Sequence, residues 1–128
     1  MKTVLILGST SDEGHAKNIT DGLDECGIKW EQHIASAHKQ PRKVLEILEA
    51  NADEKSVVYI TIAGRSNALS GFVAANSEFP TIGCPPFSDK VDMLVNVHST
   101  LQMPSKTPVL TVLDPGNCAL GVKRILEV

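Results

Sequence analysis

The sequence lacks a charge excess of either sign and lacks long apolar runs. Its 12 Lys and Arg residues face 15 Asp and Glu, which gives a formal net charge of −3. A protein that wraps a nucleic acid carries a basic patch, so this balance argues against such a partner. No apolar run approaches the ~20 residues of a membrane span, and the apolar start is too short for a signal sequence. We therefore expect a cytoplasmic protein with no nucleic-acid and no membrane partner.

Cysteine and aromatic residues are also scarce. Cys26, Cys84 and Cys118 are odd in number, widely spaced and contain no CxxC pair, which disfavours a disulfide framework or a zinc site. Free buried thiols are the favoured interpretation. Phe, Trp and Tyr make up 4% of the chain, so few rings are available to stack on a flavin.

What the chain does contain is an alternation of strand and helix patterns over a single domain, residues 1–128. A length of 128 residues and a hydrophobic share of 42% suit one globular core. Short apolar and β-branched runs predict strands at 3–7, 28–35, 56–62, 81–83 and 109–113. Helical spacing of apolar residues predicts a helix after each strand, with the second beginning at Pro41 and the last after Asp114.

Cap residues and apolar faces add detail to these helices. Ser11 or Asp12 can cap the first helix, and Ser88 the fourth. Gln40 is a weak cap for the second, whose start must then be held by another contact. The fourth helix carries one apolar side, made of Val91, Leu94, Val95, His98 and Leu101. We expect His98 on this side to be a core or interface histidine rather than a catalyst.

The alternation defines the fold class as α/β, a three-layer α-β-α sandwich with a flavodoxin-like parallel sheet, because right-handed crossovers place helices on both faces. The common small version has strand order 2-1-3-4-5, in which the loop after strand one lies between those after strands two and three. Residues 8–12, 36–39 and 64–67 form these loops. All three are polar and rich in small residues, and they meet at the carboxyl edge of the sheet.

The first loop, Gly8-Ser9-Thr10-Ser11-Asp12, has neither the Walker pattern nor the three-glycine dinucleotide fingerprint, so neither ATP nor NAD is indicated. It ends at a helix N-terminus, where backbone N–H groups and the hydroxyls of Ser9 and Ser11 can hold one phosphate. Asp12 repels phosphate and suits a ribose diol. A plain capping turn without a ligand is an equally good interpretation of this loop taken alone.

The other two loops add charge and a titrating group. In Ser36-Ala37-His38-Lys39, the imidazole of His38 can act as acid or base near neutral pH, and Lys39 adds positive charge to a bound phosphate or carboxylate. Gly64-Arg65-Ser66-Asn67 brings further donors, although Arg65 fits a surface charge or a subunit ion pair as well. Together the loops favour a small phosphorylated, sugar-bearing ligand with a histidine beside its reactive group.

Two rivals share this fold. A regulatory module of receiver type brings an acidic cluster after strand one and a phospho-accepting aspartate after strand three, whereas strand three here ends in Ala63-Gly64. An FMN carrier is disfavoured because no aromatic residue lies in the three loops. A non-enzymatic regulatory or nucleotide-binding module stays as the remote alternative to an enzyme.

Several motifs in order resemble one family, the aminoimidazole ribonucleotide carboxylases of purine biosynthesis, also called the PurE family. The similarity spans nearly the whole chain, and the ordered set is far more specific than any one loop. The motifs that carry it are Gly8-Ser9-Thr10-Ser11-Asp12, Ser36-Ala37-His38-Lys39 with Pro41, Ala63-Gly64-Arg65-Ser66-Asn67, Gly83-Cys84-Pro85-Pro86 and Leu101-Gln102-Met103-Pro104.

Within that family the sequence resembles the second branch, class II, which uses carbon dioxide directly and is best known from animal bifunctional enzymes. The commoner bacterial branch, class I, has Ser-Ala-His-Arg and Gly-Gly-Ala-Ala-His at the corresponding positions and rearranges N5-carboxyaminoimidazole ribonucleotide. His38-Lys39 and Arg65-Ser66-Asn67 depart from that pattern. Mutase activity of the class I type remains the alternative, and without a fused synthetase domain we expect a stand-alone enzyme.

The resemblance implies reversible addition of carbon dioxide to C4 of 5-aminoimidazole ribonucleotide, giving 4-carboxy-5-aminoimidazole ribonucleotide with no ATP, biotin or metal. It implies His38 as the base that removes the C4 proton. It also implies that phosphate and ribose contact Ser9, Asp12 and Ser36, while Lys39, Gly64 and Ser66 line the phosphate and carbon dioxide side. The remaining substrate-binding candidates are Ser11, Arg65 and Asn67.

The resemblance further implies a symmetric homo-oligomer, often an octamer, with sites at subunit junctions. The small residues of the predicted helix 68–75 suit close packing against a neighbour. The change from arginine to lysine at Lys39 means that phosphate contacts cannot be copied from class I, because lysine forms no bidentate fork.

Overall fold

Five parallel strands form the centre of the structure, a computed structural model that describes residues 1–128. Their order is β2-β1-β3-β4-β5, as predicted. The expected flavodoxin-like α/β fold is therefore confirmed. The strands are β1 (Lys2–Leu7), β2 (Trp30–Ile34), β3 (Val57–Ile62), β4 (Thr81–Gly83) and β5 (Leu110–Thr111).

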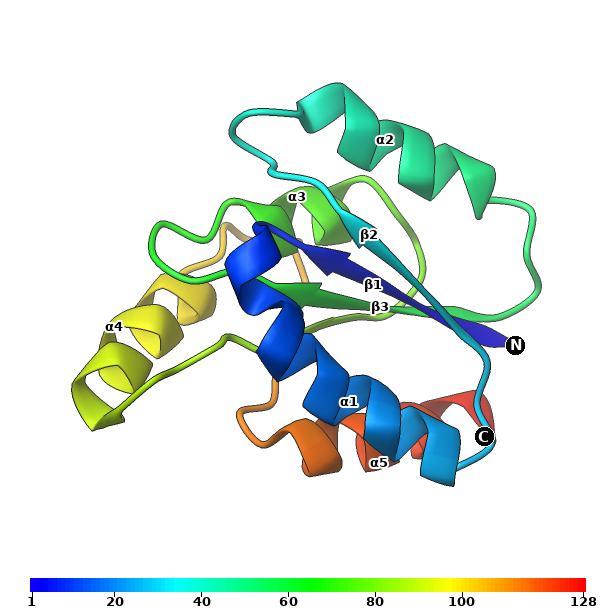
Figure 1. The fold of residues 1–128 in the computed structure, drawn as a ribbon. Coiled ribbons are helices and arrows are strands. Elements are labelled where there is room, and N and C mark those ends of the chain that lie inside the picture. The colour runs from blue at the N-terminus through cyan, green and yellow to red at the C-terminus, as the bar shows by residue number, and fades with distance from the viewer.

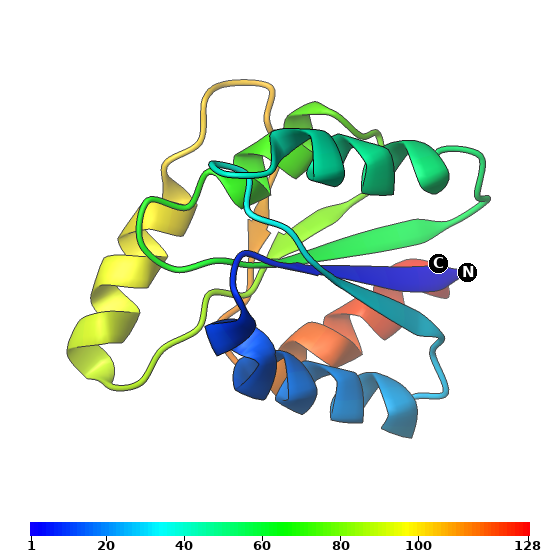
Figure 2. The same ribbon diagram turned by 45° about the horizontal axis from the view of Figure 1, so that its top comes forward.

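Helices cover both faces of this sheet, so the molecule has three layers (Figures 1 and 2). α1 and α5 pack on one face, α2 and α3 on the other, and α4 stands at the carboxyl end of the strands. None of these helices is both long and apolar enough to cross a membrane. The helices are α1 (Glu13–Glu25), α2 (Pro41–Ala50), α3 (Leu69–Ala75), α4 (Lys90–Leu101) and α5 (Pro115–Leu126), with a short 3₁₀ turn at Thr10–Asp12.

Strands β1 and β3 are buried on both faces of the sheet, which explains their continuous apolar runs. Along β1, Leu5 points to the core beneath α1 and α5, whereas Val4 and Ile6 point to the core beneath α2 and α3. Strand β2 is half exposed and lies at the sheet edge, as its mixed composition predicts. The period-two alternation of β1 thus joins two separate cores through one strand.

Asp12 occupies the N-cap position of α1, as predicted, but without a side-chain capping bond, and the predicted Ser88 cap of α4 is wrong by one residue. Neither Ser11 nor Asp12 caps the first helix with its side chain; Ser9 instead accepts a hydrogen bond from the Ser11 N–H and begins the 3₁₀ turn that leads into α1. At α4 the cap is Asp89 rather than Ser88, because the Asp89 carboxylate accepts the N–H of Asp92. In both places the residue with extended backbone geometry serves as the cap.

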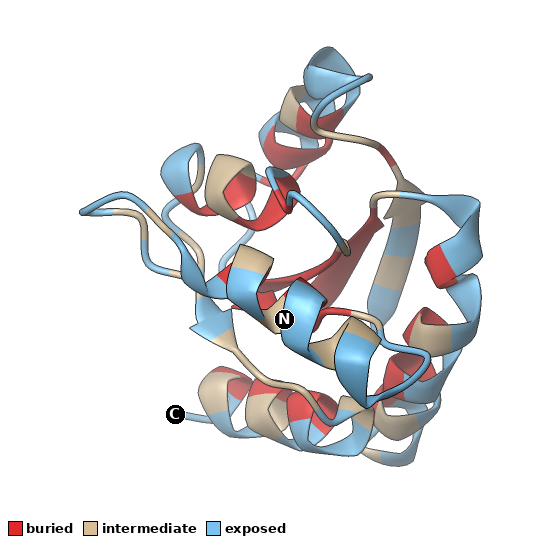
Figure 3. Cartoon of the chain, turned by 90° about the vertical axis from the view of Figure 1, so that its left-hand side faces the viewer, coloured by how far each residue is buried: buried red, intermediate tan, exposed pale blue.

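α4 is oriented opposite to an ordinary surface helix. Its buried residues are polar, Asn96 and Thr100, while Val91 and Leu94 on its apolar side are 72% and 61% exposed. Figure 3 faces this helix and shows its outer surface as exposed or intermediate. His98 is exposed as well. His98 therefore does not lie in the core of this chain, and its expected position at an interface stays a prediction.

The contact between α1 and α5 gives a stability prediction. A Cβ on Gly22 would lie 2.8 Å from the Ala119 Cβ, whereas a Cβ on Gly121 would meet nothing within 4 Å. We expect Gly22→Ala to lower the free energy of unfolding by about 1–3 kcal/mol through overpacking. Gly121→Ala, the matched control inside a helix, should raise it by about 0.5–1 kcal/mol. Urea unfolding measures both, and equal effects of the two substitutions would contradict this packing.

Candidate active site

The three loops that follow β1, β2 and β3 line one cavity of about 300 Å³. This volume is at the small end of the range for ligand pockets. All predicted site residues line it except Lys39, whose side chain is exposed beside it. The lining residues are Gly8, Ser9, Ser11, Asp12, Ser36, Ala37, His38, Ala63, Gly64, Arg65, Ser66, Asn67, Ala68 and Leu69.

The first loop is folded by its own hydroxyls. Ser9 Oγ accepts hydrogen bonds from the Ser11 N–H at 3.2 Å and from the Ser11 hydroxyl at 3.0 Å. The Ser9 hydroxyl hydrogen remains free to donate, and both serines are exposed at the cavity. This end of the cavity can therefore hold an anion through hydroxyl and backbone donors at a helix start.

Ser36 fixes the turn that carries His38. Its Oγ accepts the Lys39 N–H at 3.2 Å, its carbonyl accepts the Gln40 N–H at 2.7 Å, and its N–H donates to Gln40 Oε1 at 3.4 Å. These bonds close a turn before Pro41 and fix Gln40, the N-cap residue of α2, whose side chain makes no capping bond. The exposed imidazole of His38 lies on this turn and lines the cavity.

The third loop contains the one non-glycine residue of the site in the left-handed region, Ser66, with φ of 52°. Asn67 lines the cavity but is 91% buried, since its relative exposure is 9%. Its amide bonds to Ser70 and Thr100 inside the protein. Arg65 extends into solvent, 4.0 Å from the Asp92 carboxylate. Gly64, Ser66 and Asn67 of this loop therefore line the cavity, and the Asn67 amide is also bonded inside the protein.

Asp12 is the only buried carboxylate of the chain. Burial raises its pKa, while a backbone hydrogen bond from Ser9 and the nearby His15 act in the opposite direction. No other side chain forms an ion pair with it. A buried acceptor without a charged partner is suited to the two hydroxyls of a ribose.

Behind Asp12 lies a group that sequence reasoning missed. The His15 Nε2 is 3.6 Å from the buried Cys84 Sγ, and its ring contacts Phe87 edge-on at 5.9 Å between centroids. Hydrogen bonding to Cys118 and to His15 lowers the pKa of Cys84 to about 6, and the same pairing raises that of Cys118. The only available signal was the spacing of Asp12 and His15, which lie three residues apart at the start of a helix.

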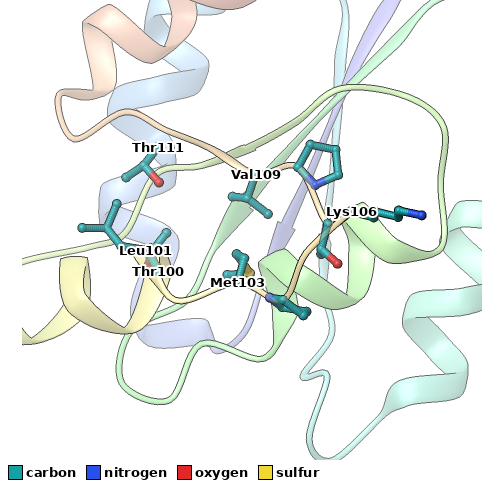
Figure 4. Close-up of a pocket in the computed structure, with 9 residues that line it drawn as sticks. Thr100, Leu101, Met103, Lys106, Val109 and Thr111 are labelled. Atoms are coloured by element: carbon teal, nitrogen blue, oxygen red, sulfur yellow. The ribbon is translucent and has the colours of Figure 1, made fainter.

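A hollow of about 410 Å³ adjoins the cavity of the three loops and shares Ser11, Asp12, Gly64 and Arg65 with it, and His15 and Asp92 are among its other lining residues. Two further hollows contain no histidine. A groove of about 430 Å³ lies between the end of α4 and β5 and is drawn in Figure 4. Thr100, Leu101, Met103 and Lys106 are among its lining residues, and none of its members is a histidine or a carboxylate. A second, of about 630 Å³, lies between α2 and α3 near Phe79. The smaller cavity at the carboxyl edge is therefore the candidate active site.

The fold and this cavity define a doubly wound α/β protein with a polar ligand site at the carboxyl edge of its sheet, where such folds bind ligands. The particular family follows from comparison of the chain with known proteins. The model of the family described as AIR carboxylase matches residues 2–128. The chain belongs to this family.

Three relatives illustrate the similarity. The chain is 47% identical over 125 residues to the phosphoribosylaminoimidazole carboxylase of Archaeoglobus fulgidus, a match covering 98% of this chain and 68% of that protein. It is 37% identical over 125 residues to the human bifunctional phosphoribosylaminoimidazole carboxylase/phosphoribosylaminoimidazole succinocarboxamide synthetase. That match covers 97% of this chain and 29% of the human protein. The crystal structure of Treponema denticola PurE superposes with a TM-score of 0.89 at 43% identity, covering 98% of this chain and 79% of that one.

The buried carboxylate of Asp12 gives a prediction on stability. Because its pKa in the native state lies above the ordinary carboxyl value, the native state binds more protons between the two values, and the free energy of unfolding falls as pH rises through that window. Asp12→Asn removes the titrating carboxyl group and with it this pH-dependent fall in the free energy of unfolding. At pH 7 we expect the variant to be at least as stable as the parent, with the advantage shrinking toward pH 3.5.

Chemical denaturation at the two pH values measures this effect. Asp53→Asn, at an exposed position, is the matched control and should show no such trend. If Asp12→Asn instead loses stability relative to the parent as pH rises, burial does not raise the pKa of Asp12.

Proposed function

We propose that this protein adds carbon dioxide reversibly to C4 of 5-aminoimidazole ribonucleotide, in the cytoplasm, as a step of de novo purine biosynthesis. The observation that carries the proposal is the convergence of His38, the Ser9–Asp12 loop and the Gly64–Ser66 loop on one small cavity. Relatives named as phosphoribosylaminoimidazole carboxylases support the same reaction.

In this proposal the ribonucleotide is held by its non-reacting parts. The phosphate contacts the hydroxyls of Ser9, Ser11 and Ser36, and the exposed Lys39 adds charge from the rim. Asp12 accepts hydrogen bonds from the ribose hydroxyls. Such contacts fix the ring and supply the proximity that a weakly bound gas requires, because orientation of two reactants removes much of the entropic barrier.

The chemistry needs one base. The 5-amino group makes C4 nucleophilic, so C4 attacks the carbon of carbon dioxide, a C–C bond forms and one C=O π pair moves to oxygen as carboxylate. C4 then carries both a proton and the new carboxylate. His38 takes that proton, the C–H electron pair returns to the ring, and aromaticity is restored. The atoms balance without ATP, and the residues described supply every group used.

Direct use of carbon dioxide is favoured over rearrangement of N5-carboxyaminoimidazole ribonucleotide by two local features. Lys39 replaces the arginine, and Arg65-Ser66 stands in the loop after β3, where Ser66 adopts φ of 52°. Gly64 and Ser66 then line the side on which carbon dioxide meets the ring. The mutase reaction is the outcome that would replace this proposal.

We also propose that the enzyme is a homo-oligomer, up to an octamer, in which a second copy covers the outer side of α4. Val91, Leu94 and Leu101 on this side are at least 60% exposed, and Val95 is 44% exposed. A monomeric protein rarely leaves a contiguous apolar surface of this kind open. The polar inner side of the same helix contacts the active-site loop.

The catalytic proposal predicts the behaviour of a single variant. With 5-aminoimidazole ribonucleotide and bicarbonate-buffered carbon dioxide, the parent should form the carboxylated product, followed by its ultraviolet absorption. His38→Asn should bind the ribonucleotide but lose about 10²–10⁴-fold in kcat, the usual contribution of a general base. His33→Asn, on β2 away from the cavity, is the control. Full activity of the His38 variant would remove this residue from proton transfer.

The assembly proposal predicts that Leu94→Glu lowers the oligomeric mass, because a carboxylate would be buried in an apolar contact. Native mass spectrometry or size-exclusion chromatography with light scattering measures the mass. Leu120→Glu, at a position 42% exposed on α5, serves as the control. Loss of assembly only in the Leu120 variant would move the interface to α5, and an unchanged mass in both would contradict a contact at α4.

A further inference from the structure

We propose that Ser99 and Thr100 on α4 are positioning residues that hold the Gly64–Asn67 loop in its catalytic shape through Asn67. The proposal rests on the function proposed above and adds residues that touch neither the cavity nor a substrate. It follows from the side of α4 that faces inward, where the buried residues are polar.

The inward side of α4 is a stripe of polar residues at helical spacing. Asp92, Asn96, Ser99 and Thr100 recur at intervals of four, three and one, which places them on one face of the helix. Asn96 and Thr100 are 4% and 1% exposed. A helix that served only to cover a core would bury its apolar residues. Burial of the polar stripe instead indicates directed contacts.

Those contacts end on the last residue of the loop. The Asn67 N–H donates to Ser99 Oγ at 2.5 Å, and Asn67 Nδ2 donates to Thr100 Oγ1 at 3.0 Å and to Ser70 Oγ at 2.8 Å. Asn67 Oδ1 accepts the Ser70 N–H at 3.0 Å. The amide has used its donors and acceptor, so the position and rotation of Asn67 are fixed by α3 and α4 together.

The start of the loop packs closely against the same helix, without a hydrogen bond to it. Asn96 Nδ2 donates to the Pro86 carbonyl at 2.6 Å, which places Asn96 Oδ1 3.3 Å from where a Cβ on Gly64 would lie. Thr100 Oγ1 in turn donates to the Asn96 carbonyl at 3.0 Å. α4 therefore packs against Gly64 at the start of the loop and hydrogen-bonds Asn67 at its end.

The hydrogen bonds between Asn67 and the hydroxyls of Ser99 and Thr100 are called the clamp below, and the conformation of Ser66 shows its effect. Its φ of 52° lies in the left-handed region, which a non-glycine residue occupies at a cost and keeps only where its surroundings enforce it. Ser66 has no hydrogen bond of its own within the chain, whereas the next residue is fixed by Ser99 and Thr100. The clamp on Asn67 is thus the structural reason that Ser66 faces the cavity in this conformation.

The first test separates positioning from folding by kinetics. In Ser99→Ala the Asn67 N–H loses its acceptor, and we expect kcat to fall about 10–10²-fold, the effect of a misplaced site. The KM for the ribonucleotide should change less than about threefold, because the phosphate and ribose are held by the other two loops. Ser99→Thr keeps the hydroxyl and should restore most of kcat. Ser105→Ala, at an exposed serine, is the control.

Unchanged kcat in Ser99→Ala, or a Ser99→Thr variant as impaired as Ser99→Ala, would overturn the proposal. If Ser99→Ala does not fold, Ser99→Cys, whose thiol is a weaker acceptor at the same position, takes its place with the same expected loss. A general loss of stability alone would lower the active fraction and leave kcat per active site unchanged.

The second test does not depend on turnover. Ser66→Gly relieves the left-handed conformation and should raise the unfolding midpoint of the parent, but not that of Ser99→Ala, where the released loop has already relaxed. If Ser66→Gly stabilises the parent and the Ser99→Ala variant equally, residues 66 and 99 are not coupled and the proposal of the clamp is overturned. If no variant carboxylates the ribonucleotide, the proposed function fails, and this stability cycle still decides whether the clamp exists.

Discussion

The parallel pairing of β1 with both β2 and β3 is the constraint on which the site depends. Leu7, the last residue of β1, pairs with Ile34 on one side and with Ile62 on the other. Three loops therefore leave the sheet at the same level and within reach of one small ligand. Burial of β1 on both faces holds this register, because a slip by one residue would exchange its two core-facing sets. The chemistry of the cavity is a consequence of that register.

Much of this arrangement could be predicted from the sequence because it follows from local patterns. The apolar run of β1, the stop at Gly8 and the Pro41 start of α2 are all visible in a few consecutive residues. The strand order and the meeting of the loops that contain Asp12 and His38 follow from the alternation of elements. The alternation of strands and helices predicts only that these residues lie close together, and their chemical roles came from the family resemblance.

What could not be predicted depends on contacts between distant residues. Asn67 was predicted as a ligand-binding residue, and nothing in its loop indicates that its amide binds Thr100 or that its N–H binds Ser99, which lies 32 positions away. The prediction that α4 has one apolar side was correct, but the sequence pattern does not show that this apolar side faces outward. His15 was missed because its partner, Cys84, lies 69 positions along the chain. Periodicity identifies a face, and tertiary packing decides what the face meets.

α4 links the two proposals that go furthest beyond the fold. Its inner side holds the loop between Gly64 and Asn67, and its outer side carries the exposed apolar residues around Leu94. A subunit seated on the outer side would restrain the same helix that shapes the site. Assembly and catalytic geometry would then share one element, which gives a physical reason for a helix whose polar side faces inward.

The central claim is direct carboxylation, and one measurement tests it most directly. Initial rates are compared for the parent protein supplied with 5-aminoimidazole ribonucleotide and dissolved carbon dioxide, or with N5-carboxyaminoimidazole ribonucleotide alone. The account predicts product only from the first mixture, at a rate that rises with the concentration of carbon dioxide. Product formed only from the N5-carboxy compound would contradict it and assign the chain to the mutase reaction.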